Sequence, residues 1–183
     1  MKRIKKLSVI AIAIVLIFAS CKKGTNDPTF SFSSRDARIT AEWVLKTSNN
    51  TIVHVEIIGS ETYTETTTYV FDGTTMKKTK NIGFGDEIIS YPYAYEIVIN
   101  KDGTYNETEN KDGEKTEKTN YWFWANSDKS KIAINFAGIG TFMINRLAKD
   151  ELVLTQSTVT SNTDADGNVS TDNSDIIMTF SKK

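Results

Sequence analysis

From about Arg38 to Lys183, apolar and polar residues alternate along the chain with a period of two. This alternation is typical of β-strands that bury one face and expose the other. Four Asp-Gly pairs, which supply the positive φ angles of tight hairpins, interrupt it. They are Asp72-Gly73, Asp102-Gly103, Asp112-Gly113 and Asp166-Gly167. Weaker breaks fall at residues 48–50, 83–85, 126–129, 138–140 and 148–150, so the pattern predicts nine or ten short strands.

The alternation also assigns side chains to faces. Trp43 and Leu45 share one apolar stripe, and further stripes recur along the chain: Val53/Val55/Ile57, Tyr91/Tyr93/Tyr95/Ile97/Ile99, Ile132/Ile134/Phe136, Phe142/Ile144, Leu152/Leu154 and Ile176/Met178/Phe180. A sheet with one apolar face and one solvent-exposed face is typical of antiparallel strands. A sheet with this many strands curls and closes into a barrel, which leaves no unpaired edge strands. We therefore expect an all-β fold, an antiparallel barrel of about 8–10 strands. The only helical candidate is a single turn over residues 34–40, where a serine can cap it.

The first twenty residues form a separate segment. MKRIKK is basic, and Leu7 to Ser20 is an apolar run of about 14 residues, the length of a signal-peptide core and shorter than the ~20 residues of a membrane-spanning helix. The run ends in Phe-Ala-Ser-Cys, with Cys21 the only cysteine of the chain. Small residues directly before a cysteine resemble the lipobox of bacterial lipoproteins. That resemblance implies acylation of Cys21 and a lipid anchor in the bilayer.

These signals divide the chain into three parts: a signal peptide over residues 1–20, the lipidated Cys21 with a polar tether up to residue 37, and the barrel over 38–183. Lys22 rather than an aspartate follows the cysteine, which by resemblance to bacterial sorting rules favours the outer membrane. The periplasmic face and the cell surface both stay open. With no second cysteine, the fold has no disulfide to stabilise it.

Charge argues against a nucleic-acid partner. Four of the 22 basic residues and none of the 23 acidic ones lie in the first twenty positions, so the remainder carries a net charge of about −5. A nucleic-acid binder would present a basic face instead.

Four segments of the sequence resemble segments of the lipocalin-like domains of bacterial lipoproteins. They are the opening strand at residues 41–45, an apolar strand with Lys-Asp-Gly and Thr-Tyr at 95–108, a Trp-x-Trp strand leading to an Ile-rich strand at 121–136, and a Phe-x-Ile strand leading to Glu-Leu-x-Leu at 142–156. The resemblance covers roughly residues 38–181. It implies a small up-and-down barrel whose interior holds a hydrophobic ligand, and it implies no particular activity.

Residues that carry catalytic chemistry are sparse. His54 is the only histidine and is expected on the wet face, opposite Val53 and Val55. The carboxylate pairs Glu107/Glu109 and Glu114/Glu117 have the composition of a glycoside-hydrolase site, but their place beside Asp-Gly turns predicts solvated hairpin tips. We therefore expect no enzyme and no cofactor.

The segment from Asn162 through Asp164 and Asp166 to Gly167 resembles the start of an EF-hand calcium loop. Asn173 stands where the closing glutamate would lie, and no flanking helices are predicted. A hairpin turn with solvated acids is the favoured interpretation, with calcium as the alternative.

The aromatic residues are the main candidates for a binding site. Tyr91, Tyr93 and Tyr95 form a stripe, and parity places Trp122 and Trp124 inward, with Tyr121 and Phe123 outside. If the barrel is hollow, these two inward groups face one interior and bind a small apolar or amphipathic ligand. A filled barrel would instead serve as an interaction or scaffold module of the cell envelope. A cavity of roughly 300 Å³ or more favours the ligand.

Overall fold

The structure, a computed structural model, describes residues 26–28, 33–83, 85–136 and 139–183. The expected signal peptide and Cys21 lie outside the described residues. The described part is almost entirely β-structure, with one short helix and ten strands. The elements are α2 (Arg35–Ile39), β1 (Glu42–Ile58), β2 (Glu61–Phe71), β3 (Thr75–Asn81), β4 (Asp86–Ile99), β5 (Thr104–Lys111), β6 (Glu114–Trp124), β7 (Lys131–Phe136), β8 (Ile139–Leu147), β9 (Glu151–Thr163) and β10 (Val169–Lys182).

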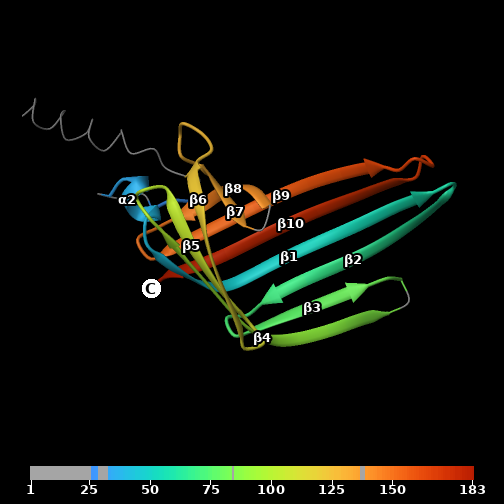
Figure 1. The fold of residues 1–183 in the computed structure, drawn as a ribbon, viewed down its shortest axis with the longest axis horizontal. Helices are drawn as coiled ribbons and strands as arrows, with labels where there is room; N and C mark the ends of the chain where they lie inside the picture. Colours follow the sequence, from blue (N-terminus) through green and yellow to red (C-terminus); the bar gives the residue numbers. More distant parts are fainter. Residues whose placement is uncertain (1–25, 29–32, 84, 137–138) are drawn as a thin grey trace, which may run out of the picture.

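The ten strands pair antiparallel in chain order, and β10 returns to β1, so the sheet closes into a barrel-like ring (Figure 1). The expected all-β class and strand number are confirmed. The first residues of β1, Glu42 to Val44, also pair directly with Val98 to Glu96 of β4. The eight strands other than β2 and β3 therefore close on themselves, and β2 and β3 add a hairpin between β1 and β4.

All four Asp-Gly pairs lie in hairpin turns, as predicted. Asp112 and Gly113 form the two-residue connection between β5 and β6, with φ of +53° and +87°. Two positive φ angles in succession are what a tight hairpin with the natural strand twist requires. The predicted break at residues 48–50 is wrong, because this polar stretch pairs with both β10 and β2 inside a continuous β1. The turn lies instead at Gly59 and Ser60.

A β-bulge at Lys46 changes the face assignment of β1. Leu45 pairs with Phe180 and Thr47 with Thr179, so Lys46 is the extra residue. One inserted residue moves every later side chain to the other face. Ser48 and Asn50 therefore follow Trp43 and Leu45 on the inner side. The stripe of Val53, Val55 and Ile57, expected on the apolar face with them, lies on the outer side.

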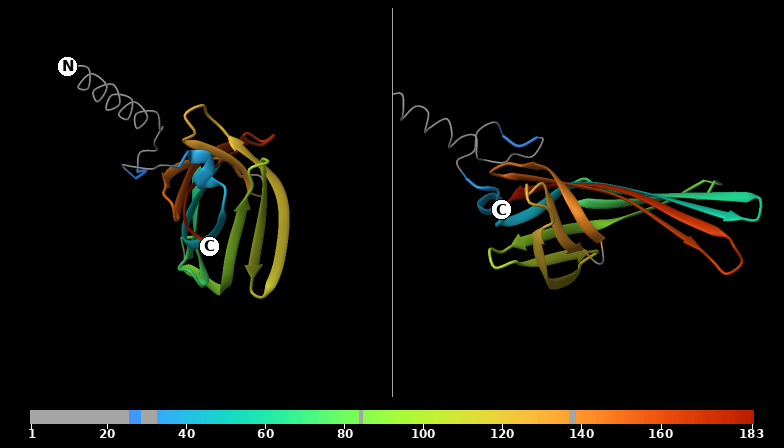
Figure 2. Two further views of the ribbon diagram at one scale, coloured as in Figure 1. Left: turned by 90° about the vertical axis from the view of Figure 1, so that its left-hand side faces the viewer. Right: turned by 90° about the horizontal axis from the view of Figure 1, so that it is seen from above.

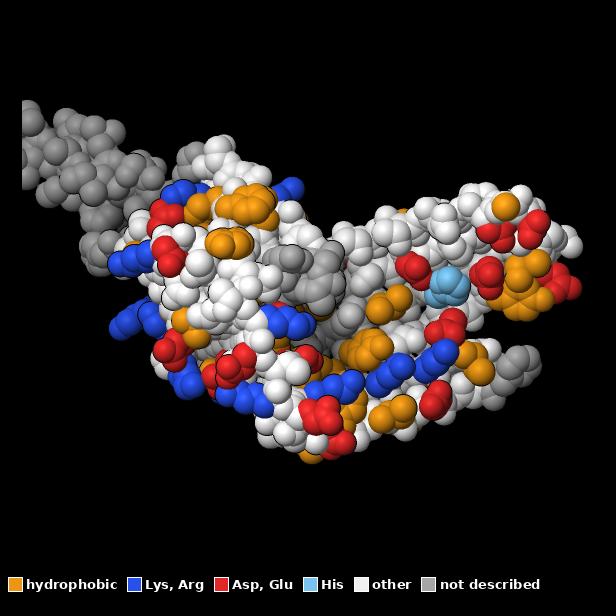
Figure 3. Space-filling model, viewed as in Figure 1, with side chains coloured by type: hydrophobic (Ala, Val, Ile, Leu, Met, Phe, Trp, Pro, Cys, Tyr) orange, Lys and Arg blue, Asp and Glu red, His pale blue; other side chains and the backbone are white. Residues whose placement is uncertain are grey.

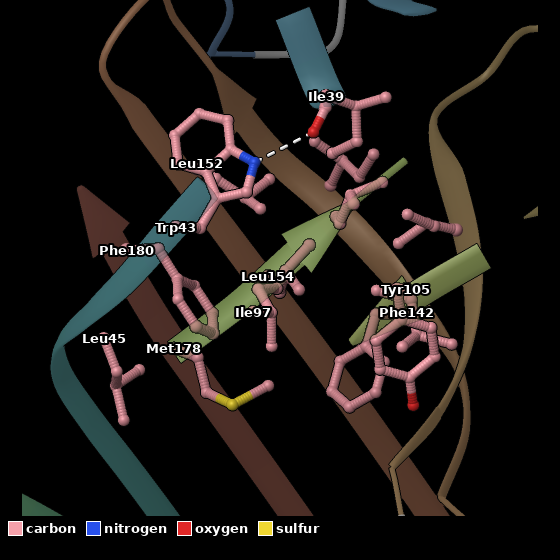
Figure 4. Close-up of a cluster of buried hydrophobic side chains, with 14 of the residues drawn as sticks. Ile39, Trp43, Leu45, Ile97, Tyr105, Phe142, Leu152, Leu154, Met178 and Phe180 are labelled. Carbon is pink, nitrogen blue, oxygen red and sulfur yellow. Dashed lines mark hydrogen bonds between the residues drawn. The ribbon is translucent and has the colours of Figure 1, made fainter. Parts of the chain in front are cut away.

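The core fills the end of the ring that α2 covers. Trp43, Ile97, Tyr105, Phe142 and Phe180 come from five different strands and are each fully buried (Figure 4). The Trp43 indole Nε1 donates a 2.9 Å hydrogen bond to the carbonyl oxygen of Ile39, the last residue of α2. The helix begins as expected, with the Ser34 hydroxyl accepting a hydrogen bond from the Ala37 backbone N–H. The first strand is therefore fastened to the helix that closes the barrel.

Part of the expected tether belongs to this packed end. Asp27 has no exposed side-chain surface, and Arg35 and Arg38 are 4% and 6% exposed. The Asp27 carboxylate lies 2.9 Å from Arg35 and 3.2 Å from Arg38, and it accepts a 2.8 Å hydrogen bond from the Leu147 backbone N–H. The folded domain thus includes residues that precede the predicted boundary at residue 38.

At the opposite end, long strands project beyond the ring as an open sheet (Figures 1 and 2). We call this part the arm. It consists of residues 49–58, 61–70, 75–81, 86–92, 156–163 and 169–176. None of residues 51–66 is buried. Figure 3 shows hydrophobic side chains interspersed with charged ones along the arm.

Candidate binding site

A cavity of about 330 Å³ lies where the barrel meets the arm. Its lining has two chemically different sides. Strands from the first half of the chain and β10 contribute an apolar and aromatic side, which includes Tyr69, Met76, Tyr91, Tyr93, Tyr95 and Met178. Strands β5 and β6 contribute a polar side made of Glu107, Glu109, Lys111, Thr116 and Lys118. The cavity is therefore amphipathic.

The predicted tyrosine stripe lies in this cavity. Alternation along β4 turns Tyr91, Tyr93 and Tyr95 to the inner side, with Tyr95 only 8% exposed. The Tyr93 ring packs edge-on against Phe71, with ring centroids 5.4 Å apart, and against Tyr91 at 6.4 Å. Edge-to-face contacts of this kind hold aromatic rings in fixed orientations.

Burial favours the protonated, neutral form of the Tyr93 and Tyr95 hydroxyls. Loss of solvent, reinforced by the neighbouring Glu109 carboxylate, raises the pKa of Tyr93 above its usual value. Burial and the Glu107 carboxylate raise the pKa of Tyr95 in the same way. Both effects disfavour the charged phenolate. The hydroxyls therefore stay protonated at neutral pH and can donate hydrogen bonds.

Glu107 corrects the expectation of a solvated hairpin tip. It lies opposite Ile97 in the β4–β5 pairing and is only 7% exposed. Its Oε2 accepts a 2.8 Å hydrogen bond from the Tyr95 hydroxyl, and its Oε1 lies 3.8 Å from the Lys118 ammonium. A buried carboxylate needs such partners, because burial without them is costly. The polar side of the cavity was therefore missed by sequence reasoning.

A signal for this polar side does exist in the sequence. Tyr105, Glu107, Glu109 and Lys111 are spaced two apart, so they share a face of β5. Tyr105 is a core residue, fully buried. Continuing the two-residue alternation from Tyr105 along β5 places the carboxylates of Glu107 and Glu109 on the inner face.

Trp122 and Trp124 point inward, and Tyr121 and Phe123 are 77% and 64% exposed, so the predicted parity is confirmed. The tryptophans do not share the tyrosines' cavity, however. Trp122 Nε1 donates a 2.7 Å hydrogen bond to the Asn100 carbonyl oxygen, and Trp124 Nε1 donates one of 2.7 Å to Asp36 in α2. They stack edge-to-face at the closed end of the barrel, with centroids 5.6 Å apart. Both groups therefore belong to or pack against one buried cluster, as expected, but only the tyrosines line the cavity, because β6 carries its tryptophans to the α2 end.

His54 lies on the side of the arm that continues the barrel interior, because the bulge at Lys46 inverts the parity of β1. Its Nδ1 is 2.7 Å from the Asp172 carboxylate on β10. That hydrogen bond, together with the negative charge of Asp172, raises the pKa of the exposed His54 ring. Lys80 pairs with Glu65 at 2.9 Å on the same side of the arm. These pairs place charged side chains on the inner side of the arm beyond the cavity.

The calcium candidate forms a turn. The Asp164 Oδ1 accepts 2.9 Å hydrogen bonds from the backbone N–H groups of Asp166 and Asn168, and its Oδ2 accepts one from the Asn168 side chain. Asp164 thus organises the β9–β10 hairpin. Within the described residues, no group of three or more His, Cys, Asp or Glu side chains is placed to hold a metal ion.

A second hollow, of about 560 Å³, lies beside β8, where Lys131, Thr141, Met143, Thr155 and Ile177 contribute to its lining. None of the tyrosines of the first cavity takes part in it. Among the helices that the structure describes, none is long and apolar enough to cross a membrane. No protein-family model, curated protein or solved structure matches this chain.

Proposed function

We propose that this protein is a lipid-anchored, non-enzymatic binding protein whose lipocalin-like barrel takes up one small apolar or amphipathic ligand. The amphipathic cavity of about 330 Å³ carries the proposal. Small-molecule sites are typically concave, mostly apolar, and of roughly 300 Å³ or more, with a few polar groups that set orientation. The Tyr91/Tyr93/Tyr95 stripe supplies the apolar surface here, and Glu107 with its neighbours supplies the polar groups.

The strand order supports the lipocalin-like part of the proposal. The eight strands β1 and β4–β10 follow one another around the ring in an up-and-down order. Barrels of about eight strands either fill with side chains or hold one small ligand. Here the core around Trp43 fills one end, and the cavity of about 330 Å³ lies toward the other. The β2–β3 hairpin is an addition to that plan.

The ligand proposal can be tested with a neutral apolar fluorophore, N-phenyl-1-naphthylamine, titrated into the purified protein. We expect saturable binding at one site. Tyr93→Ala should weaken it several-fold, because aromatic contacts are worth roughly 0.5–1.5 kcal/mol. Tyr121→Ala removes an equal side chain from the outside and should leave the titration unchanged. No saturable binding to folded protein would contradict the proposal.

An interaction module is the second candidate function, and the arm is the observation that favours it. Its outer side exposes Ile57 and Val159, which are 42% and 71% accessible. Large apolar side chains exposed on one face often mark interaction surfaces. A failed fluorophore titration would leave this function as the better proposal.

The anchor is proposed from the sequence of the first 21 residues. A lipoprotein cysteine carries two or three acyl chains such as palmitate, and each buried CH₂ contributes ~0.8 kcal/mol to membrane attachment. Cys21→Ser should therefore move the protein from the membrane to the soluble fraction of cells. Immunoblots of fractionated cells measure this. A variant that is processed and still sediments with membranes would refute acylation at Cys21.

A further inference from the structure

We infer that the ligand carries an ammonium group, which pairs with Glu107 inside the cavity while an apolar body lies against the tyrosines. The inference rests on the proposed function and specifies its ligand as an organic amine. It starts from the depth at which each charged group of the cavity lies.

Carboxylates occupy the inner part of the polar side, and ammonium groups lie at its rim. Glu107 is 7% exposed and Glu109 is half-buried, whereas the Lys118 side chain is 55% exposed and Lys111 is also exposed. Electrostatic interactions are stronger where water is excluded. A charged group that enters the cavity therefore meets mainly the field of the two carboxylates.

Glu107 also has an oxygen available for a ligand. Its Oε2 is occupied by the Tyr95 hydroxyl at 2.8 Å. The Lys118 ammonium, at 3.8 Å from Oε1, is beyond hydrogen-bonding distance. An ammonium bound in the cavity can approach Oε1 to the ~2.8 Å of a charge-assisted hydrogen bond. The ligand ammonium would then replace the exposed, well-hydrated Lys118 as the ion-pair partner of Glu107.

The tyrosine side of the cavity is compatible with a cation. Lys111 Nζ lies 5.0 Å from the centroid of the Tyr91 ring, and Lys78 Nζ lies 5.8 Å from that of Tyr69. Both distances fall within the range of cation–π attraction. Rings of this site therefore already accept ammonium groups at the rim. An anionic head at the same depth would face Glu107 and Glu109 instead.

Three probes with one tail separate the head groups: hexylamine, hexan-1-ol and hexanoate. Hexylamine is protonated at neutral pH, as lysine is. Calorimetric titration of the full-length protein should give the tightest binding for hexylamine and the weakest for hexanoate. Glu107→Gln should weaken hexylamine binding by about tenfold, because it removes a charge-assisted hydrogen bond, and should leave hexan-1-ol unchanged.

Two further variants make the test independent of the folding of Glu107→Gln. Lys118→Met removes the competing ammonium and should tighten hexylamine binding several-fold without affecting hexan-1-ol. Glu117→Gln, an exposed carboxylate on β6, is the matched control and should change nothing.

Equal binding of hexylamine and hexan-1-ol in every variant would overturn the inference. Tight hexanoate binding that is lost in Lys118→Met would overturn it in favour of an anion. If the naphthylamine fluorophore binds but hexylamine does not, the head-group inference fails and the proposed function stands. If neither binds, both fail.

Discussion

Replacing Trp43 with alanine should lower the free energy of unfolding by about 3–5 kcal/mol, a large share of the roughly 5–15 kcal/mol typical of a domain. The indole has no exposed surface and packs among Leu152, Phe180 and their neighbours (Figure 4). The substitution opens a cavity and also leaves the Ile39 carbonyl oxygen without its indole donor. With a urea m-value of about 2 kcal/mol/M, the unfolding midpoint falls by about 2 M.

Urea unfolding followed by far-ultraviolet circular dichroism measures the midpoint. This signal follows the backbone, so it does not depend on which tryptophans remain in each variant. Phe123→Ala is the matched control, because it removes an aromatic ring that is 64% exposed and should change stability by no more than roughly 0.5 kcal/mol. Trp43→Phe keeps a ring but loses the hydrogen bond to Ile39, so it should fall between the two. Equal midpoints for Trp43→Ala and Phe123→Ala would place Trp43 outside the core.

The turns were predictable because their determinants are local. Asp-Gly at positions 112 and 113 allows the positive φ angles of a hairpin in almost any context, and the prediction needed no tertiary information. Residues 48–50 contain the same kind of polar, turn-prone side chains but lie within β1. There the backbone is paired on both sides, by β10 and β2, and this pairing outweighs local preference. Such long-range pairing is invisible in a short sequence window.

The bulge at Lys46 limits how far side-chain faces along β1 can be predicted from alternation. Alternation assigns faces only while the register is unbroken, and one extra residue inverts every later assignment. Trp43 and Leu45 were assigned correctly because they precede the bulge. Val53 was placed on the wrong face because it follows the bulge, whereas His54 is exposed and opposite Val53, as expected. Nothing in the composition around Lys46 distinguishes it from an ordinary outward-facing lysine.

Only the apolar side of the candidate site was predictable from the sequence. The tyrosines of β4 form an apolar stripe, and apolar stripes indicate an interior. Glu107 and Glu109 continue the inner face of β5, but charged residues are seldom buried and are interpreted as solvated. The tryptophans of β6 were assigned to the correct face, but they do not line the tyrosines' cavity. Position along the barrel depends on how all strands are staggered, which no single strand encodes.

The other large effect should come from Asp27, in the segment that sequence reasoning assigned to a flexible tether. Its carboxylate has no exposed surface and pairs with Arg35 and Arg38, both themselves buried. It also accepts the Leu147 backbone N–H, and Arg38 donates a hydrogen bond to the Leu147 carbonyl oxygen. This one side chain therefore pairs with two buried guanidinium groups and joins the N-terminal segment to the end of β8.

Asp27→Ala should cost about 3–5 kcal/mol, because removing one partner of a buried ion pair leaves the opposite charge uncompensated. Asp27→Asn keeps an acceptor for the Leu147 N–H and should cost less, which separates the charge from the hydrogen bond. Glu117→Gln, which disrupts only an exposed pair with Lys115, should leave the urea midpoint unchanged. If Asp27→Ala also leaves it unchanged, the segment around Asp27 adds nothing to stability. The folded domain would then begin at α2, close to the boundary that the sequence predicts.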